Sequence, residues 1–382
     1  MLFLLFQNYI IFLLTCGLFL CIILLNKNSR QKGIMIMTNQ TAYLTDPCNF
    51  EIRDSQIPVP EPDDIVVAVE HVGICGSDML FYNDPTVGGE LTVDLPIVLG
   101  HECAGTVVEV GSSVHHIKTG DRVALEPGVP CGKCEFCREG RYNLCPDVIM
   151  MAAPPFVTGS LSRYVKHPAA YSFKLPENVS TLEGALIEPL AIGLHAAERA
   201  NAKLGQSALI LGAGCIGLMT LLACKARGVG NIIVADLFDN RLKMAEELGA
   251  TATINSSEAD LVEEVIKLTD SQKTDLVFET AGSPHTAKLI PHLVKRGGSV
   301  TMVGNVHGDV PFDFNTFNPQ EITMTTVFRS VNDFPRAIEG VSQGYIPVSK
   351  MVSDRFDFAD VNKAFDYACN HKQEVLKVVI DL

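Results

Sequence analysis

A glycine-rich turn between a buried strand and a helix is the feature that most constrains the fold of this chain. The strand-like run Ala208–Leu211 leads directly into Gly212-Ala-Gly-Cys-Ile-Gly217, and a helical pattern continues from there to Ala226. A second apolar run, Asn231–Asp236, follows, and strand and helix patterns keep alternating to about residue 317. Such alternation predicts right-handed crossovers and a doubly wound parallel sheet, so the fold class is α/β.

The glycine spacing predicts that this turn binds a dinucleotide. Gly212 permits the tight turn, Gly214 lets the backbone approach a pyrophosphate, and Gly217 allows close packing of the helix, whose N-terminus favours negative charge. Asp236, at the end of the next strand, can accept from ribose hydroxyls and would repel a 2′-phosphate, which favours NAD over NADP. A helix N-cap is the less favoured role for Asp236. The predicted cofactor-binding residues of this region are Gly212, Gly214, Ile216, Gly217, Asp236 and Arg241.

The segments on either side of this region predict a second, mainly β domain. From Thr41 to about Val123, short β-branched runs alternate with turn residues such as Gly111 and Gly120. Mixed short elements resume after Pro319, and we expect them to return and complete this domain. The expected division is a mainly β domain of residues 37–188 and 320–382, a zinc-binding lobe of residues 126–150 within it, and a dinucleotide-binding domain of residues 189–319.

A catalytic zinc site is predicted within the mainly β domain. An apolar run ends at Gly100 and delivers His101 and Glu102 side by side, a pair that is costly to bury unless a positive charge satisfies both. Cys75 stands close to two glycines upstream, and Glu188 stands at an expected helix start downstream. Thiolate, imidazole and carboxylate ligands that leave one position open are typical of a catalytic rather than a structural zinc.

Four cysteines in one short segment predict a second, structural zinc. Cys131, Cys134, Cys137 and Cys145 offer soft thiolates in a local loop, which suits a closed tetrahedral site. The chain has 12 cysteines, but their uneven distribution favours a metal site over disulfides and hence a reducing compartment, the cytosol. The other cysteines are expected to be small core residues.

Charge and the N-terminal segment limit the partners of the chain. The formal net charge is −14 and no basic stripe is present, which argues against binding to nucleic acid. Residues 1–25 are almost wholly apolar and are followed by Lys27, Arg30 and Lys32, so this stretch is a candidate transmembrane anchor. We favour the alternative that residues 1–36 precede the natural start at Met35 or Met37.

Several motifs in fixed order resemble those of zinc-dependent medium-chain dehydrogenases, and most closely the polyol (sorbitol and xylitol) branch. They include Gly-Ile-Cys75-Gly-Ser77-Asp78, Gly100-His101-Glu102, the four-cysteine lobe, Pro154-Pro155 and Ala185-Leu-Ile-Glu188-Pro-Leu. The resemblance implies a GroES-like catalytic domain and a Rossmann domain. It also implies that Cys75, His101 and Glu102 bind zinc, that Glu188 binds zinc or its water, and that Ser77 lies in the proton path. The segments implied to border the nicotinamide are Val303, Gly304 and Asn305, and Val327, Phe328 and Arg329.

The substrate pocket departs from the pattern of the polyol branch. Met79-Leu80-Phe81 stands where a His and an aromatic residue are common, Met150 or Met151 replaces an aromatic, and Ser330 stands where a Tyr often follows the Arg. These changes reshape the pocket without changing the zinc ligands. The predicted substrate contacts are Phe81, Glu188, Arg329 and Ser330.

The function predicted from these residues is zinc- and NAD-dependent oxidation of a secondary alcohol of a polyol to the ketose. One alternative keeps the chemistry but takes a diol or an amino alcohol of the butanediol or threonine type. Another is an NAD-binding redox sensor without turnover, and a third is a membrane-tethered form of the same enzyme. The resemblance also implies a homodimer or homotetramer.

Overall fold

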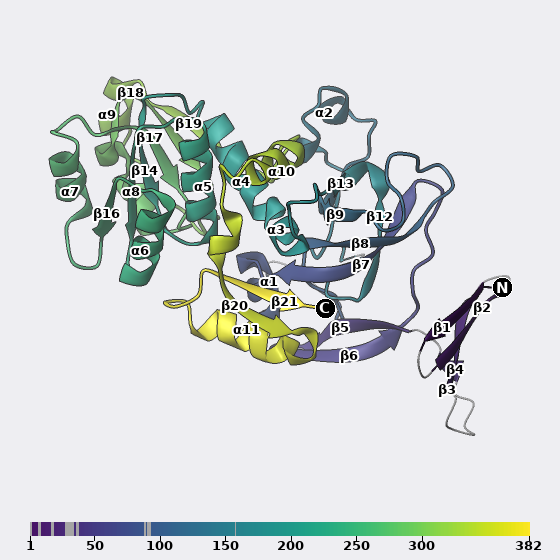
Figure 1. Cartoon of the computed structure of the whole chain (residues 1–382). Helices are drawn as coiled ribbons and strands as arrows, with labels where there is room; N and C mark the ends of the chain where they lie inside the picture. Colours follow the sequence, from purple (N-terminus) through teal and green to yellow (C-terminus); the bar gives the residue numbers. More distant parts are fainter. Residues whose placement is uncertain are drawn as a thin grey trace.

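The computed structural model shows two domains, and helix α4 (Ile187–Arg199) leads from the first into the second (Figure 1). It describes residues 2–6, 9–16, 19–26, 34–35, 38–87, 89, 93–156 and 158–382, and before residue 38 only their backbone. One domain holds a seven-stranded mixed sheet and the other a six-stranded parallel sheet. The predicted α/β fold class is confirmed.

The first domain is centred on β7 (Asp64–Gly73), which pairs with β8 (Glu102–Val110) on one side and β21 (Lys377–Asp381) on the other. Its residues Ile65, Val66 and Val67 are fully buried, because the strand is covered on both faces. The C-terminal strand therefore lies beside the strand that leads to Cys75. The other strands of this sheet are β9 (Arg122–Leu125) and β13 (Ser172–Lys174) beyond β8, β20 (Val352–Asp357) beyond β21, and β12 (Tyr164–Pro168), which also pairs with β7.

Helices α1 (Gly76–Asn83) and α11 (Val361–Asn370) pack together on this domain. Tyr82 of α1 and Phe365 of α11 meet Phe50, with ring centroids 4.8 to 5.4 Å apart. This aromatic cluster fixes α1, whose first turn follows Cys75. The remaining elements of the domain are the hairpin β5 (Asn39–Asp46) and β6 (Asn49–Ser55), α3 (Thr181–Ala185), η2 (Ala169–Tyr171), η4 (Val348–Met351) and η5 (Phe358–Asp360).

A lobe without an extended sheet projects from this domain. Its two short strands, β10 (Gly128–Val129) and β11 (Ile149–Met150), pair with each other and close its base. Between them lie α2 (Glu135–Arg138) and η1 (Tyr142–Leu144). Because so little apolar surface is buried in the lobe, cross-links through its cysteines are the expected source of its order.

The second domain is a doubly wound sheet in which all the strands are parallel. From one edge to the other, the strands are β16 (Ala252–Asn255), β15 (Asn231–Asp236), β14 (Ser207–Leu211), β17 (Thr274–Glu279), β18 (Val294–Met302) and β19 (Thr323–Thr326). This is the strand order 3-2-1-4-5-6 of dinucleotide-binding domains. The strands are linked by α5 (Cys215–Ala226), α6 (Asp239–Leu248), α7 (Leu261–Leu268), α8 (Pro284–Leu293), α9 (Phe314–Phe317) and η3 (Asn318–Gln320).

The sixth strand lies beyond the domain boundary expected at residue 319. It has the sequence Thr323-Met-Thr-Thr326 and is largely exposed, so it shows no apolar run. Its register with β18 places it in the sheet through main-chain hydrogen bonds. The signal that would mark it as a buried strand is therefore missing from the sequence.

The two domains share one apolar core along α4. This helix packs on α5 and on α10 (Phe334–Ser342). The same cluster of buried residues contains Ala104 of β8, Leu190 of α4 and Leu218 of α5. On another part of the junction, the side chains of Asn240 and Arg241 donate to the carbonyls of Gln373 and Lys372. Both sets of contacts fix the dinucleotide-binding domain against the catalytic domain.

At the N-terminus, the structure has four strands that pair only with one another among the described residues. They are β1 (Leu2–Phe6), β2 (Tyr9–Cys16), β3 (Phe19–Asn26) and β4 (Ile34–Met35). The apolar run suggested as a membrane anchor contains strands, and no described helix is long and apolar enough to cross a membrane. The basic residues Lys27, Arg30 and Lys32 lie outside the described residues.

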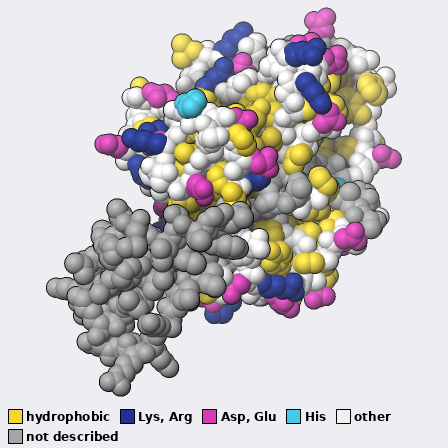
Figure 2. All heavy atoms as spheres, turned by 90° about the vertical axis from the view of Figure 1, so that its right-hand side faces the viewer, with side chains coloured by type: hydrophobic (Ala, Val, Ile, Leu, Met, Phe, Trp, Pro, Cys, Tyr) yellow, Lys and Arg dark blue, Asp and Glu magenta, His cyan; other side chains and the backbone are white. Residues whose placement is uncertain are grey.

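Lys and Arg side chains are scattered among Asp and Glu on the face of the molecule shown in Figure 2. They do not gather into a stripe there. Among the side chains coloured in this view, the positive charges form no continuous surface for a phosphate backbone.

Candidate active site

The residues Cys75, His101 and Glu102 come together at one end of the β7–β8 pair. One ligand atom from each lies within 4.8 Å of the others, and the imidazole and carboxylate are buried. Cys75 precedes α1, and Glu102 opens β8 opposite Gly73. A Cβ on Gly73 would lie 2.2 Å from a Glu102 carboxylate oxygen, so glycine is needed there. A half-buried thiol beside a buried imidazole and a buried carboxylate fits the donor set of a catalytic zinc with one open position.

Asp78 holds the imidazole of this group. Its carboxylate accepts from the N–H groups of Cys75 (3.0 Å) and Gly100 (3.1 Å) and lies 3.4 Å from Nδ1 of His101. Burial alone would raise the pKa of Asp78, but His101 and the two N–H groups outweigh it and hold that pKa below its usual value. Such a carboxylate fixes the orientation of a ligating histidine. This role of Asp78 was not predicted from the sequence, although the residue lies in the motif that contains Cys75.

Lys377 neutralises the carboxylate of Glu102. Its Nζ lies 2.7 Å from both carboxylate oxygens and also donates to the carbonyl of Ile74. The side chains are 3% and 1% exposed, so the pair is fully buried. Nearby thiols and Glu102 outweigh burial and raise the pKa of Lys377. Lys377 was not predicted as a site residue. Its only local signal in the sequence is a lone Lys within an apolar strand.

Glu188 lies beside the three ligands rather than within their group. It stands in the first turn of α4 and is buried. Burial is the main reason that its pKa is raised to about 7; Glu102 and Asp78 raise it further, whereas His101 and Lys377 oppose the rise. The carboxyl of Glu188 can therefore exchange a proton near neutral pH.

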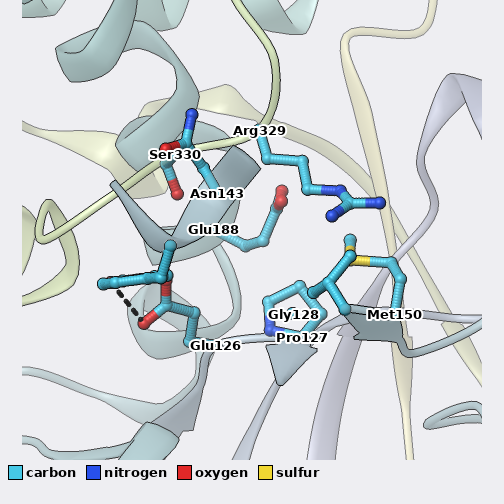
Figure 3. Close-up of a pocket in the computed structure, with 10 residues that line it drawn as sticks. Glu126, Pro127, Gly128, Asn143, Met150, Glu188, Arg329 and Ser330 are labelled. Carbon is cyan, nitrogen blue, oxygen red and sulfur yellow. Dashed lines mark hydrogen bonds between the residues drawn. The ribbon is translucent and has the colours of Figure 1, made fainter. Parts of the chain in front are cut away.

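Glu188 opens into a pocket between the lobe and the segment that follows β19 (Figure 3). In the close-up, its carboxylate and the guanidinium of Arg329 point into the same space, with Met150 below the guanidinium. Arg329 has a φ of 58° and its Nη1 is buried without a protein partner. The pocket is lined by Glu126, Pro127, Gly128, Tyr142, Asn143, Val148, Met150, Glu188, Arg329 and Ser330.

The other predicted substrate residues are divided between pocket and core. Ser330 lines the pocket, and Met150 rather than Met151 supplies the methionine. Phe81 is 8% exposed, packs edge-on against Phe156 at 5.0 Å and does not line the pocket. Ser77 lies half-buried in the first turn of α1.

The sequence reading did not identify Glu126 as a pocket residue. It is 4% exposed and Tyr142 Oη donates to its carboxylate. Burial raises the pKa of Glu126 to about 7, with smaller contributions from Asp333 and Glu188, while the bond from Tyr142 opposes the rise. A carboxylate just before a Pro-Gly turn has no sequence signal that separates it from a surface residue.

The four cysteines of the lobe also come together. Their four sulfur atoms all lie within 4.8 Å of one another, and the residues are Cys131, Cys134, Cys137 and Cys145. The N–H groups of Lys133 and then Cys134 lower the pKa of Cys131 to about 7, which favours the thiolate. This donor set fits a tetrahedral structural zinc.

The glycine loop connects β14 to α5 with the geometry of a phosphate-binding turn. Gly212 has a φ of 103°, and Gly214 precedes the first residue of α5. A Cβ on Gly217 would lie 1.8 Å from the carbonyl oxygen of Gly212, so any side chain there would separate the helix from the strand. Ile216 lies half-buried in the first turn of α5. The N–H groups at the start of α5 have no acceptor within the helix, so they can donate to a pyrophosphate.

Asp236 ends β15 beside this loop. Its carboxylate accepts from the N–H of Ala213 at 2.6 Å and from those of Leu237 and Phe238. Arg241 lies 3.9 Å from it. Val303–Asn305 and Val327–Arg329 follow β18 and β19, so they lie at the same carboxyl edge of the sheet. Ligands of doubly wound sheets bind at this edge.

Two family models match the chain. Residues 61–177 match the alcohol dehydrogenase GroES-like domain, and residues 215–343 match the zinc-binding dehydrogenase domain. An uncharacterised zinc-type alcohol dehydrogenase-like protein of Escherichia coli is 47% identical over 91% of this chain and 99% of its own. The sorbitol dehydrogenase of Bacillus subtilis is 41% identical over 86% of this chain and 94% of its own.

A solved structure has the same fold. The crystal structure of an Escherichia coli oxidoreductase of unknown specificity superimposes with a TM-score of 0.87 at 47% identity, over 90% of this chain and 99% of the other. The α/β architecture therefore belongs to a zinc-dependent alcohol dehydrogenase. The chain is a member of the zinc-dependent medium-chain dehydrogenases, in their polyol branch.

Proposed function

We propose that the protein uses NAD to oxidise a secondary alcohol group of a polyol to the ketose. The observation that supports this most directly is the convergence of Cys75, His101 and Glu102 next to a pocket that contains Glu188 and Arg329. We assign the three ligands to a catalytic zinc and the four lobe cysteines to a structural zinc. When bound, zinc would act as a Lewis acid on the substrate hydroxyl and NAD would accept the hydride.

The protein residues position the substrate and carry its proton. Glu188, with its raised pKa, is placed to accept the hydroxyl proton, and Ser77 in the first turn of α1 would pass it towards solvent. Arg329 has an unpaired Nη1 that can donate to a further hydroxyl. Burial of Glu188 strengthens its electrostatic contacts and excludes competing water.

The preference for NAD is assigned to Asp236. A carboxylate at the end of the second strand can accept from the ribose hydroxyls and repel a 2′-phosphate. Its contact with the N–H of Ala213 fixes it beside the glycine loop. Arg241 lies along the same edge and is tied to the carbonyl of Lys372, which holds it away from a phosphate-binding role.

A second substrate class is a vicinal diol or an amino alcohol. Met150 and Val148 give one wall of the pocket an apolar surface, and Ser330 is smaller than an aromatic side chain. Such a wall favours a short substrate with methyl groups over a long polyol. We further propose that the protein is cytoplasmic. We also propose that it is a homodimer or homotetramer, and light scattering on the purified protein would test this oligomeric state.

The function is tested by NADH formation at 340 nm from NAD or NADP with sorbitol, xylitol, butanediol and threonine, with and without a zinc chelator. Chelator-sensitive turnover of a polyol with NAD supports the proposal, and turnover of butanediol or threonine alone replaces the substrate class. His101→Ala is expected to abolish turnover while NAD still binds. A protein that binds NAD but turns over no alcohol would instead be an NAD-binding redox sensor.

A further inference from the structure

Glu126 is a second buried carboxylate in the pocket, and the proposed mechanism gives it no role. It follows β9 and is 4% exposed, on the side of the pocket that lies below Glu188 in the close-up (Figure 3). A carboxylate is expensive to bury, so its retention at this place needs an explanation.

The backbone of Glu126 is held from two sides. Its N–H donates to the carbonyl of Tyr171 at 2.9 Å, and its carbonyl accepts from Nε2 of His167 at 2.9 Å. Its side chain is held by Tyr142, whose hydroxyl in turn accepts from the N–H of Asn332 at 2.8 Å. The carboxylate therefore has a fixed position relative to Arg329 and Ser330, which lie on the same segment as Asn332.

The carboxylate has more acceptor capacity than the protein satisfies. Tyr142 Oη lies 2.9 Å from Oε1 and 3.2 Å from Oε2, but one hydroxyl proton can serve only one oxygen at a time. A carboxylate offers about four acceptor sites. Among the described residues, no Lys, Arg or His lies within ion-pair distance of Glu126. The remaining acceptor positions are available to whatever fills the pocket.

We propose that Glu126 determines substrate specificity by accepting a hydrogen bond from a substrate hydroxyl other than the one that is oxidised. This inference rests on the proposed function and narrows its substrate to a neutral polyhydric alcohol. One hydroxyl donates to a remaining acceptor position of Glu126 while another accepts from the unpaired Nη1 of Arg329, so both pocket groups are satisfied together. Sugar acids and sugar phosphates are disfavoured as substrates, because the carboxylates of Glu126 and Glu188 repel the negative charge of such a substrate.

Glu126→Gln tests this role with little change in shape. Because the Tyr142 hydroxyl remains bonded to the amide oxygen, the NH₂ group faces the pocket and replaces an acceptor with a donor. The variant is compared with wild type on a six-carbon polyol and on 2-butanol, both with NAD. We expect kcat/KM for the polyol to fall roughly 10- to 100-fold, mainly through KM, and that for 2-butanol to fall by less than about threefold.

Two controls separate a specific effect from a general one. Glu247→Gln, an exposed residue of α6, is expected to leave both activities unchanged. Zinc content and the melting temperature of Glu126→Gln report whether the variant is folded and loaded. A Glu126→Gln protein that loses activity equally on both alcohols, or on neither, overturns this inference alone. A wild-type protein that oxidises 2-butanol but no polyol overturns the proposed function and this inference together.

Discussion

At the scale of single residues, the buried pair Lys377 and Glu102 is the contact most sensitive to substitution. Lys377→Met leaves Glu102 buried without its ion-pair partner. Removal of one partner of a buried ion pair costs about 3 kcal/mol or more, because the remaining charge is uncompensated. We expect this loss in the free energy of unfolding, measured by urea denaturation of the chelator-treated protein.

The matched substitution for this prediction is Lys267→Met on α7, where the lysine side chain is 73% exposed. That variant is expected to change stability by less than about 0.5 kcal/mol. Equal stability of the two variants would contradict a structural role for the Lys377–Glu102 pair.

A pH-dependent term in stability comes from His167. Burial lowers the pKa of this side chain to about 4, against the bond to the carbonyl of Glu126. The unfolded chain binds the proton near pH 6.5 and the folded protein only near pH 4, so stability is lost as the pH falls between these values. The shift corresponds to roughly 3 kcal/mol.

His167→Gln keeps a donor for Glu126 and has no titrating group. The difference in unfolding free energy between wild type and variant, from urea titrations at pH 7 and pH 4, isolates this contribution from the acidic residues. We expect wild type to lose roughly 3 kcal/mol more than the variant. If the unfolding free energies of wild type and variant change with pH in parallel, the pKa of His167 is the same in the folded protein as in the unfolded chain, and the prediction is wrong.

At the scale of elements, the cysteine lobe supports one wall of the pocket. Asn143 donates to the carbonyl of Phe328, and Asn332 donates to the carbonyl of Gly140, so η1 and the chain before it hold the segment that contains Arg329. Loss of metal from the lobe should therefore disturb substrate binding as well as folding. We expect Cys134→Ser to lower zinc content from about two ions per chain to about one.

The kinetic consequence follows from the same hydrogen bonds. The kcat/KM of Cys134→Ser for a polyol is expected to fall roughly tenfold, because Arg329 is no longer held in place. NADH binding, followed by its fluorescence, should persist, since the glycine loop lies outside the lobe. Cys48→Ser, in the turn between β5 and β6, is the control. If Cys134→Ser loses one zinc but keeps the kinetics of wild type, the lobe does not position the pocket residues and this prediction is wrong.

Elements with a local sequence signal could be predicted, and those set by tertiary pairing could not. A pattern of a few residues is enough to identify the glycine loop, Asp236 and the four cysteines, because the chemistry of each depends on short spacing. Lys377 meets Glu102 only because the C-terminal strand pairs with β7, and Glu126 meets Tyr142 only through the fold of the lobe. The polar strand β19 is likewise defined by its neighbour β18.

At the scale of the whole molecule, the active site is assembled from both ends of the catalytic domain. The chain leaves this domain through α4, forms the dinucleotide-binding sheet, and returns as β20 and β21 beside β7 (Figure 1). The return brings Lys377 to the ligands and places the loop after α11 against Asn240 and Arg241. Metal site and cofactor site are thus fixed relative to each other by one continuous fold.

The N-terminal strands take no part in this assembly. Among the described residues, β1–β4 form a sheet of their own that shares no pairing with either domain. A protein that starts at Thr38 keeps β5, which belongs to the catalytic domain and in which the N–H of Ala42 donates to the carbonyl of Leu161 at 2.9 Å. We expect this shortened protein to match the full chain in zinc content, in melting temperature within about 2 °C and in kcat/KM within about twofold. A fall beyond these limits would mean that the segment before residue 38 contributes to the folded enzyme, which the strand pairing does not predict.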